Sequence, residues 1–139
     1  MLQGSCVAFA IRFVNSTICH PKLAFGEIII GGFVEQFESI LTSWSEADYQ
    51  RQWADAIRRI YFGQSASCLI TTLPFRGYAD FFECWPMRRN GDHVVFSQVW
   101  IPIEEAFDPA QPYDYFARRT AHSGARVPEW SVHLSELQG

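Results

Sequence analysis

Hydrophobic and polar positions alternate along the first third of the chain, in the pattern of half-buried strands. Between Ser5 and Val14 every second residue is apolar, and Glu27 to Ile30 leads into a short β-branched run. Gly31-Gly32 comes next, and Phe33 to Glu38 then alternates again. Two glycines between two such runs favour a two-residue hairpin turn, although a glycine bend would give the same pattern. We therefore predict three strands before residue 40.

A helical period replaces this alternation from Ser45 onward. Ser45 with Asp48 three residues later is a capping-box signature, and Trp44 and Tyr49 are placed to form a hydrophobic staple. The apolar positions then recur at three- and four-residue steps up to Gly63: Tyr49, Trp53, Ala56, Ile57, Ile60 and Tyr61. We predict one amphipathic helix over residues 45–62, whose aromatic stripe packs against the rest of the fold.

Residues 79–87 and 93–100 flank an Asn-Gly pair, the strongest short hairpin signal in the chain. With Asn90-Gly91 as the turn, Glu83 lies opposite Gln98. Pro86 has no amide hydrogen to donate, so we expect an irregular ladder beside it. Both faces are largely apolar, which predicts a central hairpin covered on both sides. One face carries Phe81, Trp85, Met87, Val94, Phe96 and Trp100, and the other Phe82, Cys84, Pro86, Val95, Ser97 and Val99.

Two further segments are typical of strands, Ser67 to Thr72 and Glu129 to Leu134. The stretch from Pro102 to Arg119 contains three prolines and shows no regular period, so we expect it to be irregular. Several strands around one helix predict the α+β class: an antiparallel β-sheet with one main amphipathic helix (about 45–62) packed on it. A length of 139 residues fits a single domain, 1–139.

The charge is unevenly distributed along the chain. Eleven basic and fifteen acidic residues give a net charge of −4, and residues 77–139 hold nine of the acids against five bases. An acidic surface repels nucleic acid and membranes and attracts a basic protein. We predict a partner-binding surface where acids adjoin tyrosines, although a solvated loop would show the same composition. Its residues are Glu104, Glu105, Asp108, Tyr113, Asp114 and Tyr115.

Residue types that carry catalysis do not form a motif in this sequence. There is no H-E-x-x-H, no G-x-S-x-G, no phosphate loop and no zinc-ligand spacing. Glu83, inside the aromatic hairpin, is the best candidate for a carboxylate with a perturbed pKa. A buried hydrogen bond between Glu83 and a glutamine is the simpler interpretation. We therefore predict no enzyme, no catalytic residue, no metal and no cofactor.

Cysteine spacing and hydropathy indicate the compartment. The four cysteines are far apart and form no C-x-x-C, so we expect free thiols: Cys6, Cys19, Cys68 and Cys84. Apolar runs are far shorter than the ~20 residues of a membrane span, and the start of the chain lacks the cationic region of a signal peptide. These features predict a cytoplasmic protein.

A resemblance to a known family rests on packing and turn residues. The sequence resembles bacterial immunity proteins of contact-dependent growth inhibition systems over residues 26–134, and the N-terminal 25 residues match no pattern. The matching positions are Gly26, Glu27, Ile28, Ile30, Gly31, Phe33, Glu35, Phe37, Glu38, Ser39, Trp44, Tyr49, Gln52, Trp53, the run 67–71, the hairpin around Trp85, Phe107, Asp108, Pro112, Tyr113, Glu129, Trp130, Val132 and Leu134.

The resemblance implies a small cytosolic protein that binds the C-terminal toxin domain of a large secreted exoprotein and neutralises it. Such toxins are commonly nucleases, tRNA-cleaving in related systems, so the implied partner is a basic protein rather than nucleic acid or a membrane. No catalytic residue is implied.

Two alternatives remain open. The first is a small-molecule-binding or enzymatic domain with a pocket near Glu83 and Trp85, which would require a deep cavity containing a carboxylate of raised pKa. The second is a homo-oligomer that uses the tyrosine-rich loop as its interface, which a monomer in light scattering would contradict.

Overall fold

The N-terminal strands form a three-stranded antiparallel sheet. The computed structural model describes residues 7–15, 21–75, 77–119 and 128–137. Strands β1 (Phe9–Phe13), β2 (Leu23–Ile30) and β3 (Phe33–Ile40) lie in the order β1-β2-β3. Ile30 pairs with Phe33 across Gly31-Gly32, so the predicted hairpin is confirmed. The first predicted strand begins at Phe9, and its residues Ser5 and Cys6 lie outside the described part.

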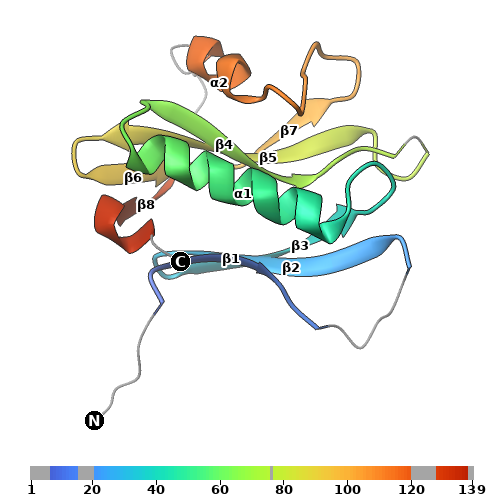
Figure 1. Ribbon diagram of the computed structural model, residues 1–139, viewed down its shortest axis with the longest axis horizontal. Coiled ribbons are helices and arrows are strands. Elements are labelled where there is room, and N and C mark those ends of the chain that lie inside the picture. The colour runs from blue at the N-terminus through green and yellow to red at the C-terminus, as the bar shows by residue number, and fades with distance from the viewer. Residues whose placement is uncertain (1–6, 16–20, 76, 120–127, 138–139) are drawn as a thin grey trace.

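The remaining strands form a second antiparallel sheet. Its order is β4 (Ala66–Thr72), β5 (Phe81–Asn90), β6 (His93–Phe96) and β8 (Trp130–His133), while β7 (Val99–Pro102) pairs with β5 beyond the end of β6. The α+β class with antiparallel strands and one main helix is confirmed. The strands are divided between two sheets, which form separate layers in Figure 1.

The turn of the β5–β6 hairpin lies one residue later than predicted. Asn90 pairs with His93, so the turn residues are Gly91-Asp92 and Glu83 lies opposite Trp100 instead of Gln98. Gly91 has a φ of 64° and no other described residue near this turn has a positive φ. A positive φ at the first turn residue alone is the pattern of a type II′ hairpin, which requires glycine at that place. The prediction had put glycine second.

Pro86 coincides with an interruption of the ladder, as predicted. β5 pairs with β6 through Met87–Asn90 and with β7 through Phe81–Cys84. Ser97 and Gln98 belong to neither strand, and Ser97 N–H donates to the Pro86 carbonyl at 3.1 Å. Because proline offers no amide hydrogen, the partner strand breaks beside it and resumes as β7.

The main helix, α1 (Glu46–Tyr61), confirms the prediction to within a residue at each end. Ser45 Oγ accepts from Asp48 N–H, and Asp48 accepts from Ser45 N–H, which completes the capping box. The rings of Trp44 and Tyr49 lie 5.2 Å apart in the predicted staple. Gly63, with a φ of 114°, follows the helix, and its N–H donates to the Ile60 carbonyl at 3.2 Å.

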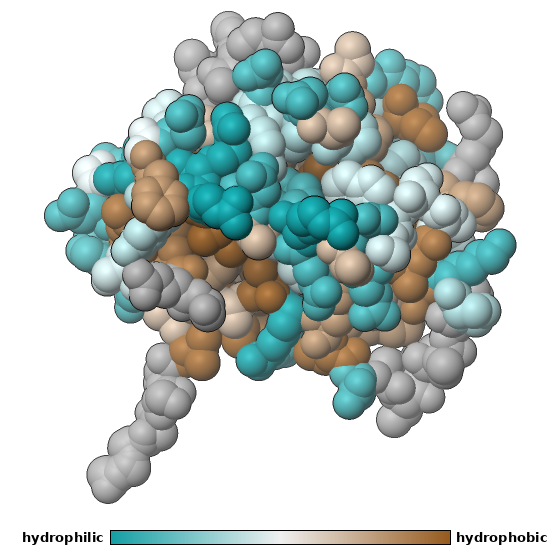
Figure 2. Space-filling view, viewed as in Figure 1, coloured by the Kyte–Doolittle hydropathy of each residue, from teal (hydrophilic) through white to brown (hydrophobic). Residues whose placement is uncertain are grey.

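Side chains of α1 bind the free edge of β4. Trp53 Nε1 donates to the Ile70 carbonyl at 2.7 Å, and Tyr49 Oη accepts from Leu73 N–H at 3.1 Å. Figure 1 shows α1 running across the open side between the two sheets, and Figure 2 shows that its outward face is mainly hydrophilic. The helix therefore closes the space between the sheets and satisfies an exposed strand edge.

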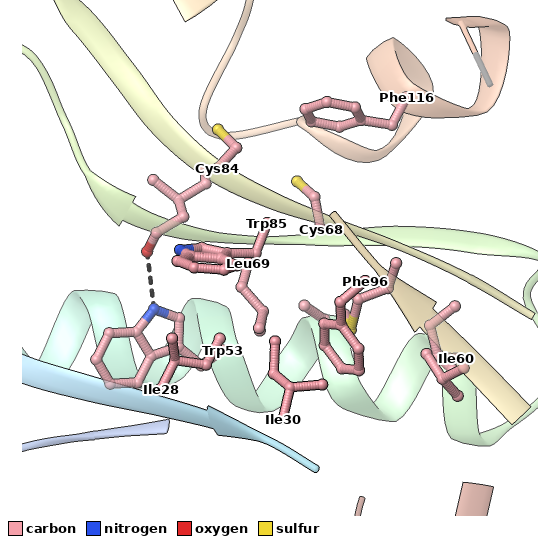
Figure 3. Close-up of a cluster of buried hydrophobic side chains, with 14 of the residues drawn as sticks. Ile28, Ile30, Trp53, Ile60, Cys68, Leu69, Cys84, Trp85, Phe96 and Phe116 are labelled. Carbon is pink, nitrogen blue, oxygen red and sulfur yellow. Dashed lines mark hydrogen bonds between the residues drawn. The ribbon is translucent and has the colours of Figure 1, made fainter. Parts of the chain in front are cut away.

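The core lies between the two sheets and against α1. Ile28 and Ile30 of β2 face Leu69, Trp85 and Phe96 of the second sheet (Figure 3). These side chains are almost completely buried. No helix in the described part of the chain is both long and apolar enough to cross a membrane.

The outer face of the second sheet is covered by a helix that was not predicted from the sequence. α2 (Tyr113–Arg119) lies inside the stretch from Pro102 to Arg119 that we expected to be irregular. Phe116 of α2 lies toward Cys68 and Cys84, which point away from the central core (Figure 3). Proline immediately before the first helical residue, and Asp114 in the first turn, are compatible with a helix start. A last 3₁₀ turn, η2 (Leu134–Leu137), follows β8.

Candidate partner-binding surface

The predicted acidic residues lie on the connection from β7 to α2 and in its first turn. Glu104 and Glu105 are exposed in a turn that is closed by a hydrogen bond from Glu105 N–H to the Pro102 carbonyl, 3.0 Å. Asp108 and Asp114 are exposed as well. None of the four acids forms an ion pair with another residue of the described part. All four carboxylates are thus exposed without a cationic partner in the described part, although Asp108 Oδ1 accepts from Ala110 N–H at 2.9 Å.

The two tyrosines of this surface make different contacts. Tyr113 is half-buried; its hydroxyl donates to Asp55 Oδ2 at 2.7 Å, and the guanidinium of Arg59 lies 4.1 Å from its ring centroid. Burial and the hydrogen bond to Asp55 both raise the pKa of Tyr113. This residue joins α2 to α1. Tyr115 contacts Phe107 and donates to Glu105 Oε1 at 3.4 Å. Their role as anchors for a partner stays a prediction.

An apolar groove borders the acidic surface. Its volume is about 390 Å³, and the side nearest α2 is lined by Glu105, Tyr115 and Phe116. The floor is formed by the outer face of β6 and β7, including Val95, Val99 and Ile101. Arg88 and Glu129 also line the groove and form an ion pair with each other. Glu105 is therefore the acid of this lining without a cationic partner in the described part, and an apolar groove with a polar rim is typical of protein interfaces.

Glu83 is buried and held by hydrogen bonds from its own chain. Its Oε1 accepts from Thr71 Oγ1 at 2.7 Å, and its Oε2 accepts from Gln98 Nε2 at 3.0 Å. Gln98 Nε2 also donates to Glu35 Oε2 of β3 at 2.8 Å. Desolvation raises the pKa of Glu83, while the bonds from Thr71 and Gln98 lower it. The predicted hydrogen bond between Glu83 and glutamine is confirmed, although Gln98 is not its strand partner.

A second hollow, of about 700 Å³, opens beside Glu83. Its lining includes Glu38 from β3, Tyr78 from the turn before β5, Phe81 from the first position of β5, and Trp100 from β7. Trp85 is completely buried and does not line it. Trp100 was predicted on a covered face, and Tyr78 was not among the predicted site residues. Aromatic residues around Gly77, in the loop before the hairpin, were the available signal.

Cysteine and histidine residues of the described part do not form a reactive group. Cys68 and Cys84 are free and buried, and burial raises the pKa of both thiols. Cys6 and Cys19 lie outside the described residues. His93 and His133 face each other across β6 and β8 with ring centroids 5.4 Å apart. The described residues contain no group of three or more histidine, cysteine, aspartate or glutamate side chains that could hold a metal ion.

Comparisons with known proteins point to one family. The model of the CdiI N-terminal domain matches residues 39–139, well over half of the chain. A chain of a solved structure, the CdiA-CT/CdiI toxin and immunity complex from Enterobacter cloacae, superposes with a TM-score of 0.72 and 19% sequence identity. The alignment covers 93% of this chain and 92% of that chain. No curated protein matches.

Proposed function

Since the chain belongs to the CdiI family of contact-dependent growth inhibition immunity proteins, we propose that it binds and neutralises the C-terminal toxin domain of its cognate exoprotein. The observation that carries this proposal is the family match over residues 39–139. A similar fold is found in a toxin and immunity complex, which supports a protein partner. The resemblance noted in the sequence names the same family.

We infer that the toxin is a basic nuclease, in particular an RNase. The connection from β7 to α2 presents Glu104, Glu105 and Asp108 without cationic partners in the described part. A nuclease surface is positively charged because it binds phosphates, so carboxylates can occupy part of that surface. The same charges disfavour direct contact with nucleic acid or an anionic membrane. The proposed site of action is the cytoplasm, where an RNase meets its substrate.

We further propose that the protein acts by occupying the toxin rather than by catalysis. The alternative, an enzyme or small-molecule binder near Glu83, is weakened by how that carboxylate is held. Thr71 and Gln98 each engage one of its two oxygens, and the described residues that line the adjoining hollow include no histidine, cysteine or lysine. A carboxylate whose two oxygens already accept hydrogen bonds from the same chain is poorly placed to take a proton from a substrate.

The test is binding and protection with the C-terminal domain of an exoprotein gene found beside this one. We expect the two purified domains to form a stable complex, and cells that produce the toxin domain to survive only when this protein is also produced. A toxin domain from an unrelated exoprotein is the matched control and should neither bind nor be neutralised. Failure to bind the neighbouring domain and to protect the cells would reject the proposed function.

A further inference from the structure

Exposed aromatic side chains gather at the end of the second sheet where β5 begins. Tyr78 is 59% exposed, Trp100 54% and Phe81 37%, and all three line the 700 Å³ hollow beside Glu83. Folding alone does not explain three large rings left in water around one concavity. Such patches on a soluble protein commonly mark a binding site.

The hollow also carries negative charge. Glu38 lies at its edge, and its Oε1 accepts from Tyr78 Oη at 3.1 Å. Glu83, which is 9% exposed, also lines the hollow. Among the described residues that line the hollow there is no lysine or arginine. Aromatic faces beside carboxylates attract a cation, because the ring quadrupole and the charge act in the same direction.

We propose that this hollow receives an arginine or lysine side chain of the cognate toxin domain, which stacks on Trp100 and Tyr78 and is neutralised by Glu38. This inference rests on the proposed function and adds a specific recognition element to it. Arginine fits better than lysine, since a planar guanidinium stacks on rings and loses less hydration when it is covered. A nucleobase could stack on the same rings, but its phosphates would meet Glu38 and Glu83.

The hollow and the acidic surface belong to one end of the molecule. Ile103 N–H donates to the Asp80 carbonyl at 3.0 Å, so the turn carrying Glu104 and Glu105 lies beside the segment that carries Tyr78 and Phe81. One partner can therefore cover both. The acids of the turn act at long range and speed encounter, whereas a cation buried among rings slows dissociation.

The experiment measures dissociation of the complex with the neighbouring toxin domain by surface plasmon resonance. Trp100→Leu keeps apolar area but removes the ring, and we expect its dissociation rate to rise about 5- to 30-fold. Trp100→Phe keeps a ring and should lie between this variant and the parent. Glu38→Gln keeps the hydrogen bond from Tyr78 without the charge and should also dissociate faster. Phe62→Ala changes a residue that is 76% exposed elsewhere and is the control.

The outcomes separate the two proposals. If the parent binds and protects but Trp100→Leu and Glu38→Gln dissociate like the parent, the cation site is rejected and the immunity function stands. If Trp100→Leu and Trp100→Phe weaken the complex equally and Glu38→Gln does not, the contact is apolar and the cation site is again rejected. If the parent itself does not bind the toxin domain, both the cation site and the proposed function are rejected. Unchanged melting temperatures of the variants exclude misfolding as the cause.

Discussion

The side chain of Gln52 takes the place of a peptide group beside Ile70. Its Oε1 accepts from Ile70 N–H and its Nε2 donates to the Cys68 carbonyl, both at 2.9 Å. A helix side chain thus pairs with the edge of β4 as a neighbouring strand would. Because both backbone groups are buried, no water can replace the glutamine.

We expect Gln52→Ala to lower the free energy of unfolding by about 2–4 kcal/mol, because it leaves a buried donor and a buried acceptor unpaired. Gln50→Ala removes an exposed glutamine of the same helix and should change stability by less than about 0.5 kcal/mol. Urea unfolding followed by circular dichroism measures both. Equal values for the two variants would contradict the edge-binding role.

Trp53 is 3% exposed and packs against Phe13 and Phe37, so Trp53→Ala should destabilise the fold by about 3–5 kcal/mol through loss of packing and cavity formation. Trp100→Ala, at a site 54% exposed, is the matched control and should have a much smaller effect. Thermal unfolding compares the two, and an unchanged midpoint for Trp53→Ala would show that the buried helix face is assigned incorrectly.

Replacing Glu104, Glu105 and Asp108 by lysine should slow association with the toxin domain and make the association rate less dependent on salt, without a loss of stability. Stopped-flow kinetics at two salt concentrations is the measurement. Asp92→Lys, in the hairpin turn at the opposite end of β5, is the control for a charge reversal outside this surface. A triple variant that binds and protects like the parent would show that these acids belong to a solvated loop and take no part in the interface.

Glu83 should make stability fall as pH rises. Its pKa in the folded protein is raised above the ordinary value of 4.5, mainly by burial. In the pH range from 4.5 to that raised value the folded state therefore binds more protons than the unfolded state, so raising the pH favours unfolding. Glu83→Gln removes this dependence. The stability of the parent relative to Glu83→Gln should decrease from pH 4 to pH 7 in urea titrations, and a constant difference would contradict it.

All four cysteines should titrate with a thiol reagent in denaturant, in protein prepared under reducing conditions. Cys68 and Cys84 should react slowly in the native state, since both are buried and burial raises the pKa of their thiols. Absorbance of the released chromophore follows the reaction. Fewer than four thiols in denaturant would reveal a disulfide and contradict the predicted cytoplasmic location.

Features set by neighbours in sequence were predictable, and those set by distant segments were not. The capping box at Ser45 and the interruption beside Pro86 depend on local hydrogen bonding, and both were predicted. The turn at Gly91 was displaced because a two-residue Asn-Gly signal does not state which turn position takes the positive φ. The division into two sheets depends on long-range contacts of β3, which packs against β4 and contacts α1 through Ile40 and Phe37, and the periodicity of the sequence does not predict such contacts.

The candidate surface shows the same difference between features set by neighbours in sequence and features set by distant segments. Charge clustering marked Glu104, Glu105 and Asp108, and their exposure agrees with that reading. Tyr113 looked equally available in the sequence but is bound to Asp55, 58 residues earlier in the chain. Trp100 was predicted to be buried because it shares a strand face with other apolar residues. In the structure it lines the hollow beside Glu83. Exposure at the end of a sheet depends on how far the facing layer extends.

The contact of Tyr113 with Asp55 and Arg59 has a consequence for binding thermodynamics. It ties the start of α2 to the long helix, which is itself bonded to β4, so Asp114 and Tyr115 are carried on a braced element. A partner that covers this surface meets a preorganised backbone and needs little ordering of it. The entropy lost on association is then mainly that of side chains and of rigid-body motion, which leaves more of the contact energy as affinity.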